Sequence, residues 1–155
     1  MATFAHDMRE RIAALGRAHS LADHTTDQGI SDLTSLVGAT LQPYRDHIPT
    51  TIEGPPVAID WRYVSSLAMI LHECATNSVK YGALGAEDGR LSVTWEHRSE
   101  GLTLHWIERM TRRAAVNTGR GFGSSLIEMS LQQLQATVER NLDESRYELT
   151  LVMPG

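Results

Sequence analysis

The sequence has a single cysteine in 155 residues, which excludes a fold held together by internal disulfides. That residue, Cys74, lies on the apolar side of a predicted helix, where a buried thiol is favoured over a metal ligand or a nucleophile. No apolar run approaches the roughly 18 residues of a membrane span, and the N-terminus has no signal-peptide pattern. These absences predict a soluble, cytoplasmic protein with no membrane contact in this segment.

Positive charge is also scarce. The net charge is -5 and the isoelectric point is about 5.8, whereas a nucleic-acid-binding domain usually shows a basic surface. No nucleic-acid partner is therefore expected. The length suits one domain with a proper core, and no internal repeat or low-complexity tract divides it.

Hydrophobic periodicity predicts helices and antiparallel hairpins. Ser31 and Asp60 are the expected N-caps of two helices, and Pro43 ends the first of them. The predicted helices span residues 3–22, 31–41, 61–81 and 122–135, and the predicted strands span 57–59, 91–95, 102–106, 137–142 and 147–153. Residues 48–56 are expected to be a connector, 82–89 a loop and 109–120 a mobile loop. With helices gathered on one face of antiparallel strands, this order indicates an α+β fold, a two-layer sandwich.

The most informative stretch is the end of the long helix, residues 71–84. Its apolar stripe is predicted to run through Val64, Leu67, Leu71, Cys74 and Val79. Four polar residues share the other face at helical spacing: Glu73, Asn77, Lys80 and Tyr81. The carboxylate can assist a nucleophile, the amide oxygen can bind Mg²⁺ and the ammonium can neutralise phosphate. A solvated polar face of an ordinary amphipathic helix is the alternative.

Three motifs resemble one family. The run LHECATNSVKYGAL closely resembles the N box of HWE-family sensor histidine kinases, whose first letter corresponds to His72. Trp106-Ile107-Glu108 corresponds to the WxE motif of that family. The run GFGSSLI, residues 121–127, matches its second glycine box, where backbone N–H groups at a helix start can approach phosphate.

The resemblance implies a GHKL (Bergerat) ATP-binding catalytic domain that uses ATP and Mg²⁺. It implies that Glu73 and Asn77 are catalytic, that Asn77 holds Mg²⁺ and that Glu108 binds the adenine amino group. The remaining cofactor-binding residues implied by it are Lys80, Tyr81, Gly121, Phe122, Gly123, Ser124 and Ser125.

The N-terminal helix is similar to the second helix of the dimerisation region in this family, through RIAALGRAHSL. Packing on its own domain is the alternative for that helix. The phosphoacceptor motif HRVKN has no match, so a histidine in trans or elsewhere in a parent protein is expected to receive the phosphoryl group. The predicted domains are a dimerisation remnant over 1–30 and the catalytic domain over 31–155. A response regulator and a possible homodimer are the implied partners.

One segment departs from the family pattern. The family usually continues WxE with one residue and then Gly-Gly-Pro, whereas here Arg109-Met110-Thr111-Arg112 follow Glu108. Glycines reach positive φ freely, so Met110 and Thr111 in their place are expected to force a different loop path. Glycines restored there are expected to tighten ATP binding. A degenerate, non-enzymatic module or phosphotransfer scaffold therefore stays open beside the kinase, as does an anti-sigma-type serine kinase. The other histidines are expected to be structural or on the surface: His6, His19, His24, His47, His97 and His105.

Overall fold

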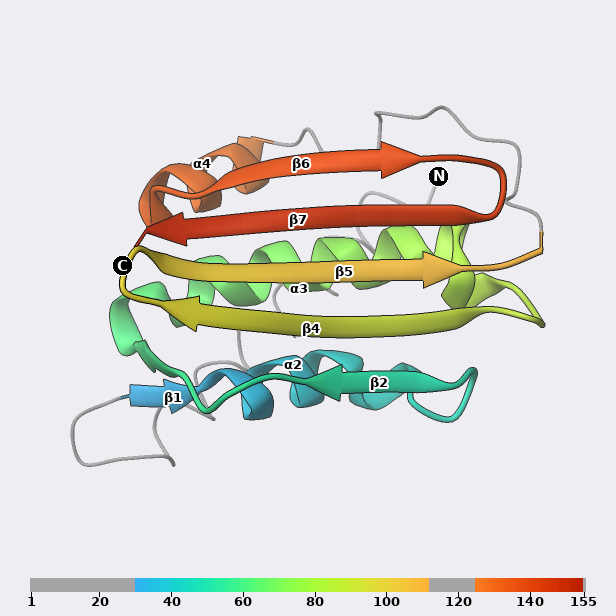
Figure 1. The fold of residues 1–155 in the computed structure, drawn as a ribbon, viewed down its shortest axis with the longest axis horizontal. Coiled ribbons are helices and arrows are strands. Elements are labelled where there is room, and N and C mark those ends of the chain that lie inside the picture. Colours follow the sequence, from blue (N-terminus) through green and yellow to red (C-terminus); the bar gives the residue numbers. More distant parts are fainter. Residues whose placement is uncertain (1–29, 112–124, 155) are drawn as a thin grey trace.

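The computed structural model describes residues 30–111 and 125–154 of the chain. In this part a five-stranded sheet is covered on one face by helices (Figure 1). The strand order is β2 (Thr50–Glu53), β4 (Arg90–Arg98), β5 (Gly101–Arg109), β7 (Arg146–Pro154) and β6 (Thr137–Leu142). Neighbouring strands are antiparallel except β2 and β4, which are parallel. A separate ribbon pairs β1 (Ile30–Asp32) with β3 (Ala58–Asp60). The predicted α+β two-layer sandwich is confirmed.

The helices are α2 (Leu33–Leu41), α3 (Trp61–Tyr81) and α4 (Ser125–Leu134), and α3 packs against both of the others. Asp60 caps α3 as predicted, since its side chain accepts a hydrogen bond from Arg62 N at 3.0 Å. The predicted cap of α2 at Ser31 is wrong. Asp32 is the N-cap and accepts from Ser35 N at 3.2 Å, because the helix begins at Leu33 and the capping position is therefore the last residue of β1.

Both predicted hairpins are confirmed. β4 and β5 pair from Arg90 opposite Arg109 to Arg98 opposite Gly101, so their turn is shorter than predicted. β6 and β7 are joined by a turn in which Asp143 Oδ1 accepts hydrogen bonds from the backbone N–H groups of Ser145 and Arg146. Strand alternation in both hairpins places one set of side chains toward the helices.

The connector predicted over 48–56 is wrong in its middle, where β2 forms a parallel edge strand with Thr50 opposite Leu91. The strand is followed at once by Gly54, and a Cβ there would overlap the Trp95 ring. Trp95 Nε1 then donates to Pro55 O at 2.8 Å. The Gly and Pro residues thus follow a strand and hold it against β4.

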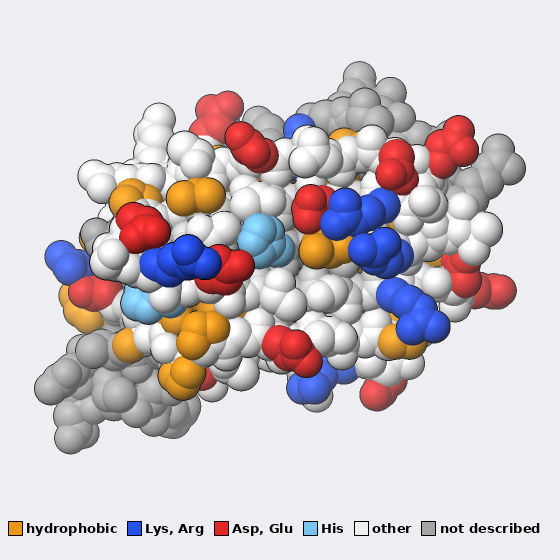
Figure 2. Space-filling model, in the orientation of Figure 1, with side chains coloured by type: hydrophobic (Ala, Val, Ile, Leu, Met, Phe, Trp, Pro, Cys, Tyr) orange, Lys and Arg blue, Asp and Glu red, His pale blue; other side chains and the backbone are white. Residues whose placement is uncertain are grey.

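The core lies between the helices and the inner face of the sheet. Its largest fully buried side chain is Trp106. The strand residues that share this face are Leu91, Val93, Trp95, Leu102, Leu104, Leu149 and Leu151. The outer face is more polar, and Figure 2 shows it as a mixture of charged and uncharged side chains.

Some predictions fall outside the described residues: the helix over 3–22, the loop after it, residues 112–120 and the first residues of the 122–135 helix. The prediction that the 109–120 loop begins at Arg109 is wrong, because Arg109 is the last residue of β5. Among the helices of the described ranges, none has the length and apolar character needed to cross a membrane.

Candidate functional site

The middle of α3 is covered on all sides. Every residue from 67 to 75 is buried, because α3 runs between the sheet, α2 and α4. Glu73 is therefore 7% exposed, and the prediction that its carboxylate lies on a face away from the core is wrong. The later members of the predicted row are more exposed than Glu73: Asn77 and Tyr81 are half-buried and Lys80 is exposed. The row thus leads from the interior to the surface at the end of the helix.

The apolar stripe also differs from the prediction at its end. Val79 is 39% exposed, whereas Ser78 is 1% exposed. Ser78 is four residues after Cys74 and lies on the same side of the helix, while Val79 is five residues after it and is turned away. A buried polar side chain needs a hydrogen-bond partner. The position of Ser78 on the apolar stripe, four residues after Cys74, is therefore the sequence signal that could have identified it.

The partner of Ser78 is Glu108, on β5. Glu108 is 3% exposed, and its Oε1 accepts from Ser78 Oγ at 2.8 Å and from Ala83 N at 2.9 Å. Its Oε2 accepts from Trp106 Nε1 at 2.7 Å. Ser78 Oγ in turn accepts from Leu84 N at 3.0 Å. We call Ser78, Ala83, Trp106 and Glu108 the Glu108 network. It joins α3, the 3-10 turn Ala83–Gly85 and β5 through one buried carboxylate.

Gly82 is the second residue that sequence reasoning missed. It ends α3, with its N–H donating to Ser78 O at 2.9 Å, and a Cβ at this position would overlap Glu108 Oε1. Its φ of -132° is open to any residue, so the close approach of the carboxylate is what requires glycine here. This close approach explains why the N-box run has glycine at position 82.

The segment that departs from the family pattern is well packed at its start. Met110 is 4% exposed, and its N–H donates to Ser145 O at 3.0 Å. Thr111 N donates to Asp88 Oδ2 at 2.8 Å, which links the segment after β5 to the loop predicted over 82–89. Among non-glycine residues of the described ranges, only Gln135 has a positive φ. The expected conflict of Met110 and Thr111 with a positive φ is therefore wrong.

The electrostatics of the interior suppress thiol chemistry. Burial raises the pKa of the Cys74 thiol far above its usual range, and the nearby carboxylates of Glu108 and Glu73 raise it further. The thiol is free and stays protonated, as predicted for a buried cysteine. Burial likewise raises the pKa of the Tyr147 hydroxyl.

Three of the histidines expected to be structural or on the surface lie within the described ranges. His47 and His97 are exposed, and half-buried His105 lies 3.5 Å from Thr150 Oγ1 through its Nδ1. In the same ranges no three His, Cys, Asp or Glu side chains gather closely enough to hold a metal ion. His6, His19 and His24 lie outside the described residues.

The second glycine box is only partly described. Gly121, Phe122, Gly123 and Ser124 lie outside the described residues, while Ser125 is exposed and begins α4. The helix packs on α3 through its buried positions, which include Ile127 and Leu134. The end of the glycine box thus forms the start of α4, and α4 packs against α3.

Comparison with known proteins agrees with the motifs. A family model described as HWE histidine kinase matches residues 1–56. A blue-light-activated histidine kinase of Erythrobacter litoralis is 30% identical over 97% of this chain. Both matches support the HWE histidine kinase family for this chain. A blue-light-activated histidine kinase of Brucella anthropi is 34% identical over 76% of the chain. The chain spans only 44% and 25% of these two relatives, less than half of either.

Solved structures of histidine kinases share the fold. The histidine kinase domain of the Erythrobacter litoralis EL346 protein matches with a TM-score of 0.74 at 14% identity, covering 94% of this chain and 73% of that one. The ATP binding domain of PrrB from Mycobacterium tuberculosis matches with a TM-score of 0.58 at 16% identity, covering 81% and 96% respectively. At these identities the likeness establishes the fold alone.

Proposed function

We propose that this segment is the ATP-binding catalytic part of a sensor histidine kinase and transfers the γ-phosphoryl group to a histidine that is not present in this chain. The observation that carries the proposal is the end of α3, where a row of polar side chains reaches the surface beside the Glu108 network. Structural neighbours include a domain named as ATP binding, and the sequence relatives are named histidine kinases.

Asn77 is the proposed Mg²⁺ ligand. Mg²⁺ usually keeps several waters and takes one or two protein oxygens together with substrate phosphates, so it needs no cluster of carboxylates. A half-buried amide oxygen near the surface end of α3 fits that requirement. When bound, Mg²⁺ would neutralise charge on the phosphates. Glu73, one turn earlier, is proposed to assist the attacking nucleophile, with Thr76 Oγ1 3.4 Å from its Oε2.

Lys80 and Tyr81 are proposed to contact the phosphates, since they lie at the exposed end of the row. Lys80 also stands in the last turn of α3, where a cation is favoured by the helix dipole without any ligand. The glycine box is proposed to cover the nucleotide with backbone N–H groups. The residues proposed for that role are Gly121, Phe122, Gly123, Ser124 and Ser125.

Glu108 is proposed to select adenine. A carboxylate accepts hydrogen bonds only, which suits an exocyclic amine, and the donors from Ser78, Ala83 and Trp106 fix its orientation. The same hydrogen bonds make Glu108 important for stability. A Glu108→Gln variant is therefore the better binding probe, and we expect it to bind ATP more weakly and to discriminate less between ATP and GTP.

The direct test is calorimetry of Asn77→Ala with a non-hydrolysable ATP analogue, with and without Mg²⁺. We expect the Mg²⁺-dependent part of the affinity to be lost while the protein stays folded, because Asn77 is only half-buried. Arg62→Ala, at the exposed start of the same helix, is the matched control. Mg²⁺-dependent affinity that is unchanged in Asn77→Ala would remove the proposed role.

A non-enzymatic scaffold is the second candidate, and the buried Met110 in place of a family glycine is the observation that favours it. A thermal shift with ATP and Mg²⁺ separates the two. A ligand at about 100 times its Kd should stabilise by roughly 2.7 kcal/mol, whereas a scaffold without a nucleotide site gains nothing.

The remaining proposals concern the longer protein. We propose that residues 1–30 contribute to a dimerisation helix, that 31–155 form the catalytic domain, and that a response regulator receives the phosphoryl group in turn. Incubated alone with labelled ATP, the chain should gain no acid-labile phosphate. Phosphohistidine at His6 or His19 would overturn this and make the N-terminal segment the acceptor.

A further inference from the structure

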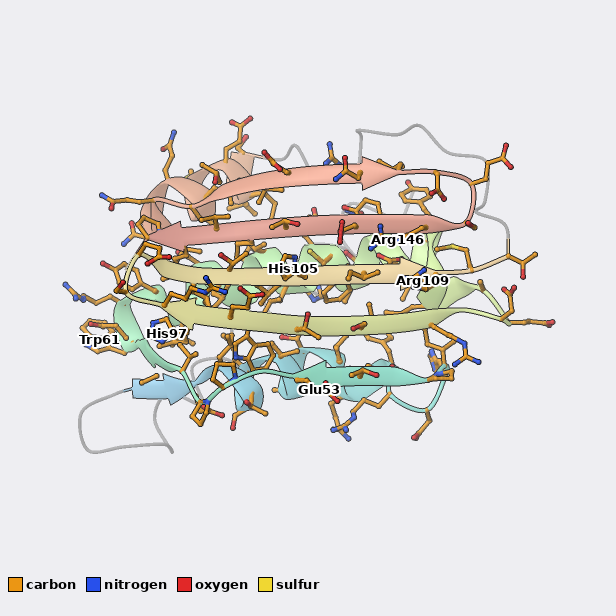
Figure 3. The ribbon with its side chains drawn as sticks, in the orientation of Figure 1. Glu53, Trp61, His97, His105, Arg109 and Arg146 are labelled. Atoms are coloured by element: carbon orange, nitrogen blue, oxygen red, sulfur yellow. The ribbon has the colours of Figure 1, made fainter. Side chains whose placement is uncertain are left out.

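Three arginines form a row across the outer face of the sheet. Strand register places Arg90 opposite Arg109 and Arg109 opposite Arg146, on the adjacent strands β4, β5 and β7. Each is next in sequence to a residue directed toward the helices, so all three side chains lie on the face away from them. Figure 3 shows Arg109 and Arg146 together at one end of these strands, and Figure 2 shows basic side chains gathered there. We call Arg90, Arg109 and Arg146 the arginine row.

The row is electrostatically unfavourable within this chain. Residues directly opposite on neighbouring strands have Cβ atoms about 5 Å apart, and like charges in such pairs are destabilising. The side chains of Arg90 and Arg109 have no ion pair or hydrogen bond to another described residue, and both residues are exposed. Arg146 pairs with Glu148 at 3.2 Å, but its buried Nε has no hydrogen-bond partner in the described part of the chain. A binding partner with negative charge would relieve this repulsion.

We propose that the arginine row is a docking surface for an acidic face of a protein partner, with carboxylates spaced to meet adjacent strands. Guanidinium groups bind carboxylates through two parallel hydrogen bonds, which a row of three arginines can repeat. Half-buried Ile107 lies on the same face one register step away, between Ser92 and Glu148. Arginine beside an apolar side chain is typical of protein interfaces.

Other anions fit the surface less well. The face is the flat exterior of a sheet, whereas a small phosphate is usually held in a concave site with converging donors. The net charge of -5 opposes long-range attraction to every anionic partner, an acidic protein included, so the proposed contact depends on short-range pairing of guanidinium and carboxylate groups. This surface lies on the opposite side of the sheet from α3 and does not depend on nucleotide binding.

The test uses a fluorescently labelled hexaglutamate peptide and measures its anisotropy with the whole chain at low and moderate salt. We expect salt-sensitive binding that weakens about three- to tenfold in Arg90→Gln/Arg109→Gln. The control is Arg45→Gln/Arg98→Gln, which removes the same charge from exposed arginines outside the row. Arg109→Lys, which keeps the charge and loses the paired donors, should give an intermediate affinity.

Three outcomes would overturn the proposal. Equal weakening in both double variants would mean that the peptide senses overall charge only. Stronger binding of tripolyphosphate, or of vesicles containing phosphatidylserine, that is lost in Arg90→Gln/Arg109→Gln would assign the row to a phosphate group or to a membrane. No binding of hexaglutamate by the wild-type chain would remove the surface altogether. Each readout is independent of ATP, so failure here leaves the proposed kinase function untouched.

Discussion

Glu108 and Arg109 are consecutive residues of β5 with opposite charges and opposite surroundings. The carboxylate of Glu108 is buried and accepts hydrogen bonds from Ser78, Ala83 and Trp106. The guanidinium of Arg109 is exposed on the other face, between two further arginines. Strand alternation alone separates them, and it makes one charge part of the framework and leaves the other available to a partner.

The comparison teaches where charge can be replaced. A buried carboxylate that organises three donors is costly to remove, because those donors lose both their partner and access to water. An exposed arginine in a row of like charge costs little to remove and can even improve stability. Substitutions on the two faces should therefore differ in both size and sign.

The largest effect is expected for Glu108→Ala. Loss of the carboxylate leaves Ser78 Oγ, Ala83 N and Trp106 Nε1 without their acceptor in the interior, at about 1 to 3 kcal/mol for each unsatisfied group. Because the losses are not additive, we expect a decrease of about 3 kcal/mol or more in the free energy of unfolding, measured by urea denaturation.

Arg109→Ala is the matched control for this prediction, since it changes the next residue on the same strand. Its effect should stay within about 0.5 kcal/mol of the wild type. If the two variants were equally stable, the Glu108 network would have no energetic importance. Gly82→Ala gives an independent check, because its Cβ would displace the same carboxylate without removing any charge.

The next effect concerns Met110, on the inner face just beyond β5. Its side chain is 4% exposed, so Met110→Ala should lower the unfolding free energy by about 2 kcal/mol or more. Met110→Leu, which nearly conserves volume, should cost less than about 1.5 kcal/mol. Replacement of residues 110–112 by Gly-Gly-Pro should destabilise the domain as well. A gain in thermal stability in that variant would contradict this account of Met110.

The case of Met110 shows what the sequence could and could not predict. The helices and hairpins were predictable because their signals are local: apolar periodicity, Asp60 as a cap, and a turn at Asp143. The burial of Met110 was not, since it depends on how the end of β5 meets the turn before β7. A family comparison flagged the residue as unusual, and only the fold shows what its side chain contacts.

The candidate site also has a part that local sequence predicted and a part that it did not. Asn77, Lys80 and Tyr81 share a helix face that spacing alone predicted, whereas the hydrogen bond from Ser78 to Glu108 joins residues 30 positions apart. No local pattern specifies which strand residue meets which helix turn. β2 was missed for a related reason, because its pairing is with the distant strand β4 and its own sequence alternates only weakly.

A smaller effect, of opposite sign, is expected on the outer face. Arg109→Thr removes the middle charge of the arginine row and places a β-branched side chain on a strand, so we expect stabilisation by a few tenths of a kcal/mol at low salt. The gain should shrink as ionic strength rises, because screening already weakens the repulsion in the wild type. Destabilisation at every salt concentration would show that Arg109 supports the fold.

The smallest effect is expected at Asp88, where the loop after α3 reaches the surface. Its Oδ2 accepts from Thr111 N at 2.8 Å. Hydrogen bonding to the side chain and to the backbone of Thr111 lowers the pKa of the carboxyl below its usual value. A folded-state pKa below the unfolded value of about 3.9 stabilises the fold above that pH, and the contribution is lost as pH falls through the folded pKa. Asp88→Ala should therefore lower the urea midpoint at pH 5, and the difference from the wild type should shrink by pH 2.5.

Asp88→Asn keeps an oxygen that can accept from Thr111 but cannot titrate, so it should lose less stability than the wild type over the same pH range. A wild-type advantage over Asp88→Ala that stays constant with pH would mean that Asp88 acts through packing alone.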